Sequence, residues 1–487
     1  MKVLMLGWEY PPHITGGLAT ACAGLCAGLH HHKVDVTFVV PRATGDEDST
    51  NARVIGCNEL EVDEETVEHV EVERVRRVAG ETREVETQRL RSRPSFVLPP
   101  NDLPAPSAYA TPSALREWLE SLHERARPVR VGTHVELETS THSVREPDRV
   151  ERSIERVPVR RRERRKYEFT GKYGPDLFAE VERYARCVEA LARREDFDLV
   201  HAHDWMTFPA GVAAARTLGR PLVAHVHACE FDRSGEKPDT RIRDLEQLGL
   251  DSAQRVVCVS HYTGSVLRKN YRVDESKLRV VHNAVTKSEQ ERSTGGSKRI
   301  DEPVVLFLGR VTYQKGPDYF LEAAARVVKV EPNVKFVMVG SGDMLPKMVE
   351  RAARMGLARH VHFTGFLKGA DVERIYSMAD IYVMPSVSEP FGISPLEALA
   401  LDVPVIVSRQ SGVSEVLRNA LKVDFWDVQE IANKILALLK FPSLKDHLLA
   451  EGRDEVRAMS WDERAAALKL VYGEVAGTPD TAPERAR

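Results

Sequence analysis

The chain has 487 residues, which is long for a single hydrophobic core, so two domains with an insertion are expected. Its 42% hydrophobic and 29% charged residues exclude a wholly disordered protein, and no apolar run is long enough to span a bilayer. The net charge of -4 excludes the strongly basic balance of many nucleic-acid-binding proteins, so no nucleic-acid partner is expected.

The first residues, MKVLMLGWEYPP, contain too short an apolar run for a signal peptide and predict a first strand. Six cysteines are scattered along the chain without a CxxC pair or a zinc-type spacing. We interpret them as small buried residues in a reducing compartment, rather than as metal ligands or disulfides, and expect a cytoplasmic protein. The six are Cys22, Cys26, Cys57, Cys187, Cys229 and Cys258.

Short valine-rich runs recur in the first half of the chain, with helix-like segments such as 177–194 between some of them. This rhythm is typical of buried parallel strands that alternate with helices. Residues 1–286 are therefore predicted to form a first doubly wound α/β domain. The runs lie at 36–40, 198–204, 221–227 and 255–260.

Residues from about 46 to 170 break this rhythm and are dense in Glu, Arg and Val. Alternation of valine with charged residues predicts strands of an inserted, solvent-facing sheet. The basic run at 157–170 is either a polyanion site or part of a salt-bridged exposed surface, and the neighbouring Glu-rich stretches favour the second reading. These residues do not assign a function to the insertion.

The α/β rhythm restarts after a polar linker at 287–302, which has a Gly-Gly centre. Residues 303–458 contain five strand candidates separated by helices and predict a second doubly wound α/β domain. Residues 459–475 predict an amphipathic C-terminal helix, and the tail at 476–487 is expected to be disordered.

The loops that follow strands are the places to search for a site, because open parallel sheets bind ligands beyond the carboxyl ends of their strands. Gly16 and Gly17 precede a helix and can let backbone N–H groups approach an anion, but taken alone the pair is more typical of plain turn geometry. Arg310 and Lys315 follow another strand and suit a diphosphate; the alternative is a pair of surface cations.

A third loop, SEPFGISPLE, carries Glu389 and Glu397 between a strand and a helix. Its N–H groups can point at phosphate oxygens, Glu389 is expected to face a cleft, and Glu397 can accept hydrogen bonds from sugar hydroxyls. The alternative is a helix cap beside a solvated glutamate.

Histidines cluster at the ends of two predicted strands, in VHAHD and VAHVH. A spacing of two places both histidines of each strand on the same face. A metal site is one interpretation, but a hydrogen bond from a cleft histidine to a polar ligand is favoured, because no carboxylate or cysteine completes a recognisable metal spacing. The set is His201, His203, His225 and His227, with Asp204 beside them.

Together these motifs resemble the retaining glycosyltransferases of GT-B architecture, in which two Rossmann-like domains face each other across a cleft. The resemblance is to glycosyltransferase family 4 and the related bacterial and archaeal glycogen synthases, and covers nearly the whole chain except the insertion and tail. The motifs that carry it are WEYPPHITGGLA, DLVHAHDW, VAHVHACEFDRSG, CVSHYTGSVL, VVHNAV, FLGRVTYQKG, VMVGSGD, VHFTGF and SEPFGISPLEALALDVPVIVS.

The resemblance implies roles for residues of the second domain. Arg310 and Lys315 would bind the donor diphosphate and stabilise charge on the leaving group. Glu389 would contact the donor sugar, and Glu397 would hold the nucleotide ribose. Backbone amides around three further residues would contact the donor; these are Phe391, Gly392 and Ile393.

In the first domain, the resemblance places Gly17 under the donor phosphates, next to Gly16. It places His227 against the donor sugar, Asp204 on the acceptor side and Asn283 near the domain junction. The C-terminal helix would cross back to the first domain. Protein cations would replace a bridging metal, so the resemblance implies neither a metal nor a cofactor.

Four positions depart from the glycogen synthase pattern, one of them in the NGV loop, which reads NAV here with Ala284 in place of the glycine. Ile14 stands where a lysine is usual in enzymes that use ADP-glucose, Thr20 replaces an aspartate, and Ala228 replaces an asparagine. The chain therefore sits nearer to the general family 4 pattern, and the missing lysine puts a preference for ADP-glucose in doubt.

The function implied is transfer of a hexose, with glucose as the first expectation, from ADP- or UDP-sugar to a hydroxyl acceptor, including a growing α-glucan. Alternatives are a transferase that makes a small glycoside or a cell-surface glycan precursor, and a non-catalytic protein that binds sugar nucleotides. The Arg310, Lys315 and Glu389 set argues against a decayed enzyme, and the partners expected are a nucleotide sugar and a carbohydrate.

Overall fold

The computed structural model describes residues 1–12, 17–78, 87–95, 149–171, 173–174, 176–285 and 301–476. Contacts divide the chain into two compact units, one of Met1–Glu59 with Phe169–Arg487 and one of Leu60–Glu168. The larger unit holds two parallel sheets, and the prediction of two Rossmann-like α/β domains is confirmed. Within the described residues, no helix combines the length and the apolar character required to cross a membrane.

The first sheet has seven parallel strands in the order β10-β9-β8-β7-β1-β2-β3. The chain starts at the inner strand β1 and adds strands outward in both directions, β2 and β3 on one side and β7 to β10 on the other, as in other doubly wound sheets. Most strand residues are buried, although those of β10 are only half-buried, and this burial explains the valine-rich runs in the sequence. The strands are β1 (Lys2–Leu6), β2 (Asp35–Val40), β3 (Arg53–Gly56), β7 (Leu199–His203), β8 (Leu222–Val226), β9 (Arg255–Cys258) and β10 (Leu278–Val280).

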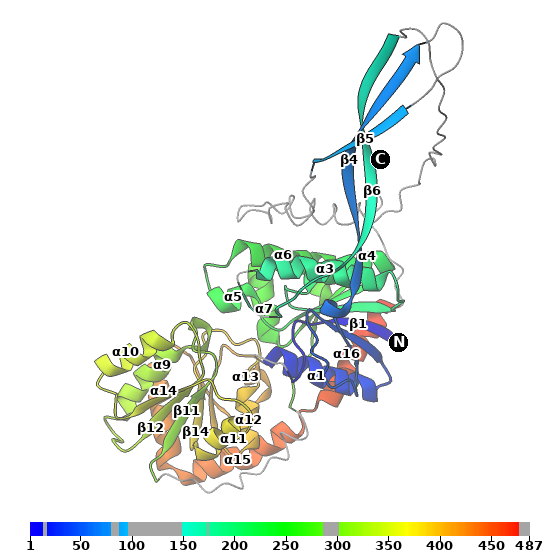
Figure 1. Ribbon diagram of the computed structural model, residues 1–487. Helices are drawn as coiled ribbons and strands as arrows, with labels where there is room; N and C mark the ends of the chain where they lie inside the picture. Colours follow the sequence, from blue (N-terminus) through cyan, green and yellow to red (C-terminus); the bar gives the residue numbers. More distant parts are fainter. Residues whose placement is uncertain are drawn as a thin grey trace. The chain divides into compact units, whose positions relative to one another are not determined.

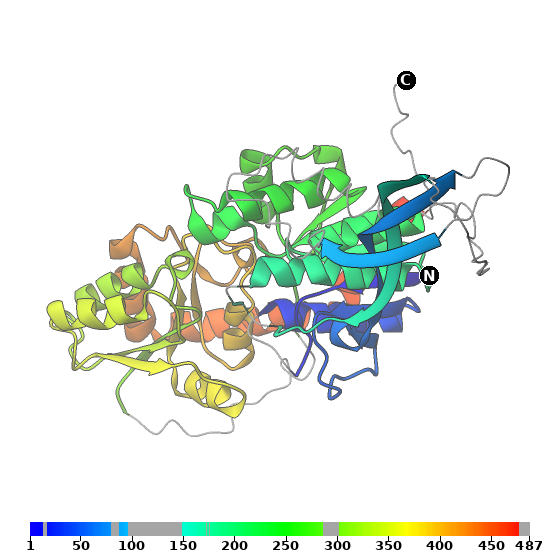
Figure 2. The same ribbon diagram turned by 45° about the horizontal axis from the view of Figure 1, so that its top comes forward.

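Helices cover both faces of this sheet (Figure 1). Helix α1 (Gly17–His31) packs along α16 (Trp461–Ala476), the last described helix of the chain, and both contribute to one core with β1 and β2 (Figures 1 and 2). The contact is close because Gly24 leaves room for the Trp461 ring, whose nearest atom would lie 2.4 Å from an added Cβ. The other helices are α3 (Leu177–Ala192), α4 (Phe208–Leu218), α5 (Glu230–Ser234), α6 (Thr240–Ser252) and α7 (His261–Asn270).

The second sheet has six parallel strands in the order β13-β12-β11-β14-β15-β16. Five of them correspond to the five strand candidates expected in residues 303–458. The sixth, β16, has only three residues, which is too short for a strand pattern to be visible in the sequence. Alternate residues of β11 enter different cores, Val305 and Phe307 on one face and Val304 and Leu306 on the other. The strands are β11 (Val304–Leu308), β12 (Lys335–Val339), β13 (Val361–Gly365), β14 (Ile381–Met384), β15 (Val405–Ser408) and β16 (Leu421–Val423).

Helices also sandwich the second sheet. Residues of α9, α10 and α14 share one core with it, and residues of α11, α12, α13 and α15 share the other. The bounds are α9 (Pro317–Val327), α10 (Leu345–Arg354), α11 (Ala370–Met378), α12 (Ser394–Ala400), α13 (Val413–Val416), α14 (Val428–Lys440) and α15 (Pro442–Arg457).

The smaller unit contains a three-stranded antiparallel sheet in the order β5-β4-β6. Its strands are β4 (Glu61–Val78), β5 (Thr87–Ser95) and β6 (Arg149–Lys166). The register sets acidic positions of β4 opposite basic positions of β6, beginning with Glu61 opposite Lys166. The insertion was predicted to begin at about 46, whereas this unit begins at Leu60, because β3 before it pairs with β2.

Candidate functional site

The loop after β11 carries the two predicted cations. Arg310 is exposed and donates a hydrogen bond from Nη2 to Gln314 Oε1 at 3.3 Å. A short 3-10 turn, Tyr313–Lys315, ends at Gly316, which has φ of 65° and begins α9. An added Cβ at Gly316 would lie 2.1 Å from Pro385 O, so only glycine allows this loop to approach the one after β14 so closely.

Lys315 and Glu389, which are 74 residues apart, meet at these loops. The Lys315 Nζ contacts Glu389 Oε2, and the Ser386 hydroxyl donates to the same oxygen at 3.1 Å. Glu389 is 5% exposed, so this carboxylate lies out of solvent with a cation and a hydroxyl as its partners. The Val387 N–H donates to Gln314 O at 2.9 Å and ties the two loops together. A backbone hydrogen bond between the two loops therefore helps to hold Lys315 and Glu389 together, in addition to their opposite charges.

The residues after Glu389 turn sharply into α12. Gly392 has φ of 94°, a conformation that side-chain-bearing residues rarely adopt, and Phe391 is buried beneath the turn. Glu397, in the first turn of α12, is half-buried and accepts a hydrogen bond at 3.2 Å from the Tyr376 hydroxyl, which also donates to Ser394 O at 3.2 Å. Tyr376 thus orients Glu397, and the sequence patterns carried no signal for it.

Gly17 of the first domain lies near this turn. A Cβ added to Gly17 would be 3.6 Å from Ile393 Cδ1, so the two predicted donor-site residues face each other. Gly16 lies outside the described residues. Asn283 is buried just after β10, and no hydrogen bond or ion pair among the described residues joins it to Glu389 or Lys315.

Asp204 lies in the turn after β7 and is buried, with φ of 59°. Its Oδ1 accepts hydrogen bonds from the N–H groups of His227 at 2.7 Å and Ala228 at 3.3 Å, and an Arg233 nitrogen lies 4.0 Å from Oδ2. Burial raises the pKa of Asp204 to about 6, although Arg233 and the two N–H groups act in the opposite direction. Asp204 and His227 are thus brought together, but by the His227 backbone rather than its ring.

The His227 ring faces another histidine. Its Nε2 lies 2.9 Å from His203 Nδ1, and burial lowers the pKa of His227 to about 3, so the ring is neutral at physiological pH. A neutral ring that is held at one nitrogen can offer the other to a polar ligand.

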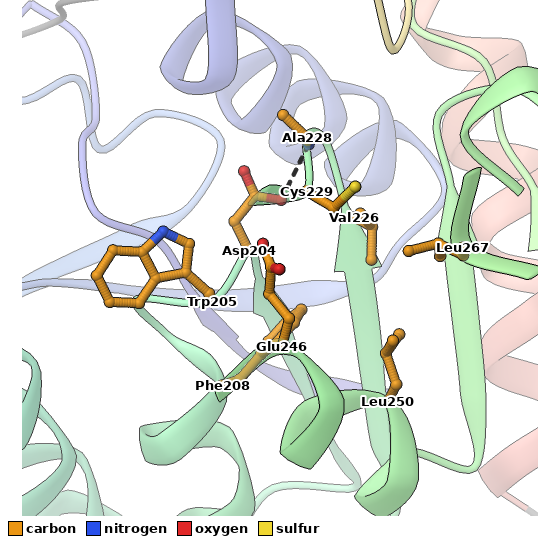
Figure 3. Close-up of a pocket in the computed structure, with 9 residues that line it drawn as sticks. All are labelled: Asp204, Trp205, Phe208, Val226, Ala228, Cys229, Glu246, Leu250 and Leu267. Atoms are coloured by element: carbon orange, nitrogen blue, oxygen red, sulfur yellow. Dashed lines mark hydrogen bonds between the residues drawn. The ribbon is translucent and has the colours of Figure 1, made fainter. Parts of the chain in front are cut away.

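Figure 3 shows a pocket beside Asp204. Apolar side chains form most of its wall, and Glu246 adds a second carboxyl group near Asp204. Burial raises the pKa of Glu246 to about 7, despite Arg233 and a hydrogen bond from Tyr271. The lining residues are Asp204, Trp205, Phe208, Val226, Ala228, Cys229, Glu246, Leu250 and Leu267.

Several polar contacts join the two domains, and sequence reasoning assigned none of these residues a role. The Ser388 hydroxyl donates to Asp232 Oδ1 at 2.5 Å, and the Tyr262 hydroxyl donates to Ser388 Oγ at 3.0 Å. The Ser260 hydroxyl donates to Pro390 O at 2.5 Å. Ser260 and Tyr262 lie within the CVSHYTGSVL motif, so the motif is the sequence feature that could have pointed to them.

A carboxylate of the second domain also caps a helix of the first. Glu415 accepts hydrogen bonds from the His261 N–H at 2.9 Å and the Tyr262 N–H at 2.5 Å, at the start of α7. Its Oε2 lies 3.0 Å from His282 Nε2, next to Asn283. Loops of both domains therefore contact each other around the segment that contains Glu389.

Three protein-family models match consecutive parts of the chain. The starch synthase catalytic domain model matches residues 2–99, the Glycosyltransferase Family 4 model matches residues 129–289, and the model for glycosyl transferases group 1 matches residues 289–455.

The curated relatives that match the chain are also named as glycosyltransferases. An uncharacterized glycosyltransferase of Methanocaldococcus jannaschii is 30% identical over 295 residues, which cover 57% of this chain and 75% of the relative. D-inositol 3-phosphate glycosyltransferase 2 of Catenulispora acidiphila is 30% identical over 318 residues, which cover 58% of this chain and 72% of the relative.

Solved structures with similar folds span almost the entire chain. Sucrose-phosphate synthase from Thermosynechococcus elongatus has a TM-score of 0.62 at 17% identity and covers 97% of this chain and 98% of its own. The catalytic domain of starch synthase IV from Arabidopsis thaliana, bound to ADP and acarbose, has a TM-score of 0.59 at 15% identity. The match covers 98% of this chain and 99% of that domain. With its paired Rossmann-like domains and these matches, the chain belongs to the glycosyltransferases of GT-B fold, in the group that includes family 4 and the glycogen and starch synthases.

Proposed function

We propose that this chain is a retaining hexosyltransferase that moves glucose from a nucleoside diphosphate sugar to a hydroxyl acceptor such as a growing α-glucan. The observation that carries the proposal is the contact between Lys315 and the buried Glu389, with Arg310 on the same loop. Such an arrangement offers cations to a diphosphate and a carboxylate to sugar hydroxyls in one place.

Departure of the nucleoside diphosphate is the step that these cations serve. Negative charge grows on the leaving phosphate oxygen while positive charge grows at the anomeric carbon. Arg310 and Lys315 stabilise the first charge from fixed positions, and this stabilisation is larger in the transition state than in the bound substrate. Glu389 orients the sugar, and Glu397, held by Tyr376, receives the ribose.

Retention follows when the acceptor attacks from the side of the leaving group. The acceptor oxygen forms the new bond to the anomeric carbon as the carbon–phosphate oxygen bond breaks, and the acceptor proton passes to the released phosphate. No protein nucleophile enters this sequence. Protein cations take the place of a metal bridge, so transfer is proposed to need neither a metal nor a cofactor.

The first domain contributes the remaining proposed contacts. Gly16 and Gly17 allow close approach of the donor phosphates, His227 contacts the donor sugar, and Asp204 faces the acceptor. Asn283 and the amides of Phe391, Gly392 and Ile393 complete the donor site. The six free, buried cysteines support a reducing compartment such as the cytoplasm as the location.

Two measurements test the proposal. Isothermal titration with UDP and with ADP is expected to show binding of at least one, with affinity reduced in Arg310→Ala. Incubation with a panel of nucleotide sugars is expected to release the matching nucleoside diphosphate slowly in the absence of acceptor. The exposed Lys347, which lies in α10, gives a matched control: Lys347→Ala should leave both results unchanged, whereas Lys315→Ala and Glu389→Ala should abolish transfer.

The outcomes separate the alternatives. Binding without turnover of any nucleotide sugar would favour a non-catalytic sugar-nucleotide-binding protein. Near-normal turnover in Lys315→Ala or Glu389→Ala would remove the assignment of these residues. Identification of the acceptor by product analysis separates glucan extension from synthesis of a small glycoside.

A further inference from the structure

Four histidine rings gather on one face of the first sheet, at its carboxyl edge. His203 of β7 is in register with His225 of β8, and the histidines two residues away complete the set. The ring centroids of His201 and His203 are 4.3 Å apart, as are those of His225 and His227, and those of His203 and His225 are 5.0 Å apart. Buried parallel strands are usually lined by valine, isoleucine and leucine, so packing of the sheet alone does not explain four imidazoles at this place.

Hydrogen bonds satisfy only part of this cluster. His201 Nδ1 lies 2.7 Å from the Tyr472 hydroxyl and its Nε2 lies 3.2 Å from His225 Nδ1, while His203 Nδ1 lies 2.9 Å from His227 Nε2. Among the described residues, the buried Nε2 atoms of His203 and His225 have no hydrogen-bond partner. A buried polar atom without a partner is costly, and an ion or water that completes it is a common explanation.

Cys22 supplies a thiol to the same cluster from α1. One ligand atom from each of Cys22, His203 and His227 lies within 4.8 Å of the other two. Cys22 is fully buried and free of any disulfide. A tetrahedral zinc ion, with bonds of about 2.0–2.3 Å, holds its ligand atoms about 3.3–3.6 Å apart, so movements of about 1 Å would close the site.

We propose that Cys22, His203 and His227 form a binding site for a zinc-type divalent transition metal. A thiolate with two neutral imidazoles is the donor chemistry that zinc prefers over calcium or magnesium. Burial keeps both histidines uncharged, as metal ligation requires, because it lowers their pKa values. Burial also raises the pKa of Cys22, so the thiol keeps its proton until a metal displaces it.

Metal binding is a proton exchange with a defined balance. The ion forms a bond to Cys22 Sγ, the thiol proton leaves to solvent, and one lone pair from each imidazole completes the three protein bonds. The shared hydrogen bond between His203 and His227 opens as the tautomers adjust. The metal itself takes no part in the proposed transfer reaction, although the site shares His227 with the proposed donor contacts.

Occupation of the site has a consequence that rests on the proposed function. If His227 contacts the donor sugar, a metal that holds its ring withdraws it from the substrate, and zinc is expected to inhibit transfer reversibly. The metal also fixes the start of α1, which carries Gly17, to the ends of β7 and β8.

Cobalt and zinc binding to the full-length protein test the site directly. Reduced protein stripped with a chelator should take up one equivalent of Co²⁺ and show a thiolate-to-cobalt charge-transfer band that zinc abolishes. Cys22→Ser should lose the band and bind zinc at least about 100-fold more weakly, since even loss of an outer-shell partner costs 10–100-fold. Cys26→Ser is the matched control, because Cys26 is also buried on α1 but contacts Met5 Sδ at 3.8 Å, and it should bind as the unmodified protein does.

The proposal is overturned if the unmodified protein binds no metal in competition with a weak chelator, if no thiolate band appears, or if Cys22→Ser binds zinc normally. The band of the unmodified protein decides the case even if the serine variant does not fold. Loss of zinc inhibition in Cys22→Ser tests the link to transfer separately. An inactive protein that nevertheless binds one cobalt through Cys22 would refute the proposed function and leave the metal site standing.

Discussion

Replacement of Lys315 by methionine would leave Glu389 as a buried carboxylate without its cation. The Lys315 side chain is 21% exposed and that of Glu389 is 7% exposed, so the pair is only weakly screened. Two unit charges about 4 Å apart at an effective dielectric of about 20 interact by roughly 4 kcal/mol, and removal of one partner of a buried pair costs about 3–5 kcal/mol.

Two features reduce this cost in the present site. The Ser386 hydroxyl still donates to Glu389 Oε2 at 3.1 Å, and the partial exposure of Lys315 means that water already shares in its solvation. We therefore expect Lys315→Met to lower the free energy of unfolding by about 2–3 kcal/mol. Because the proposed function also assigns Lys315 to the donor diphosphate, kcat should fall by about 10²–10³-fold or more.

Urea unfolding followed by circular dichroism, together with a transfer assay, separates the structural role from the catalytic one. The double variant Lys315→Met with Glu389→Gln removes both charges and should recover stability to within about 1 kcal/mol of the original protein while remaining inactive. Strictly additive stability losses would show that the two side chains do not interact. Recovery of transfer in the double variant would refute the view that these groups act on the substrate.

Two further predictions concern stability. Burial raises the pKa of Glu246 from 4.5 to about 7, so the folded state binds the proton more tightly than the unfolded chain and stability falls as pH rises from about 4.5 to about 7. Glu246→Gln should abolish its share of this fall, about 3 kcal/mol, in urea titrations at pH 5 and pH 8; an unchanged pH dependence would contradict the assignment. Gly24→Ala should lower stability by about 1–3 kcal/mol in scanning calorimetry, because its Cβ would overlap the Trp461 ring. Gly473→Ala, where no atom lies within 4 Å of an added Cβ, should instead gain about 0.5–1 kcal/mol, and equal effects of the two substitutions would contradict the packing described for α1 and α16.

Much of the fold was predictable because its physical causes are local in the sequence. Strands covered by helices on both faces must be apolar at nearly every position, so the valine-rich runs of β7, β8 and β11 mark them directly. Ligands of such a sheet bind in the loops that follow the strands, so the sequence alone points to Arg310, Lys315 and Glu389.

Other features leave no such trace. β16 has three residues and β3 has four, so both strands are too short to show a repeating pattern. β3 also lies just before the insertion, where the valine-rich rhythm stops. The hydrogen bond from Ser388 to Asp232 joins residues 156 apart, and nothing in either segment names the other.

The amino-acid sequence by itself determined the two α/β domains, the loops that carry the cations and carboxylates, and the family to which they point. Only the tertiary structure decided that Lys315 reaches Glu389, that Tyr376 holds Glu397, and that Cys22 lies beside His203. The reason is physical: burial and periodicity act on neighbouring residues of one segment, whereas a contact between segments depends on how separate strands and helices pack, which no single segment encodes.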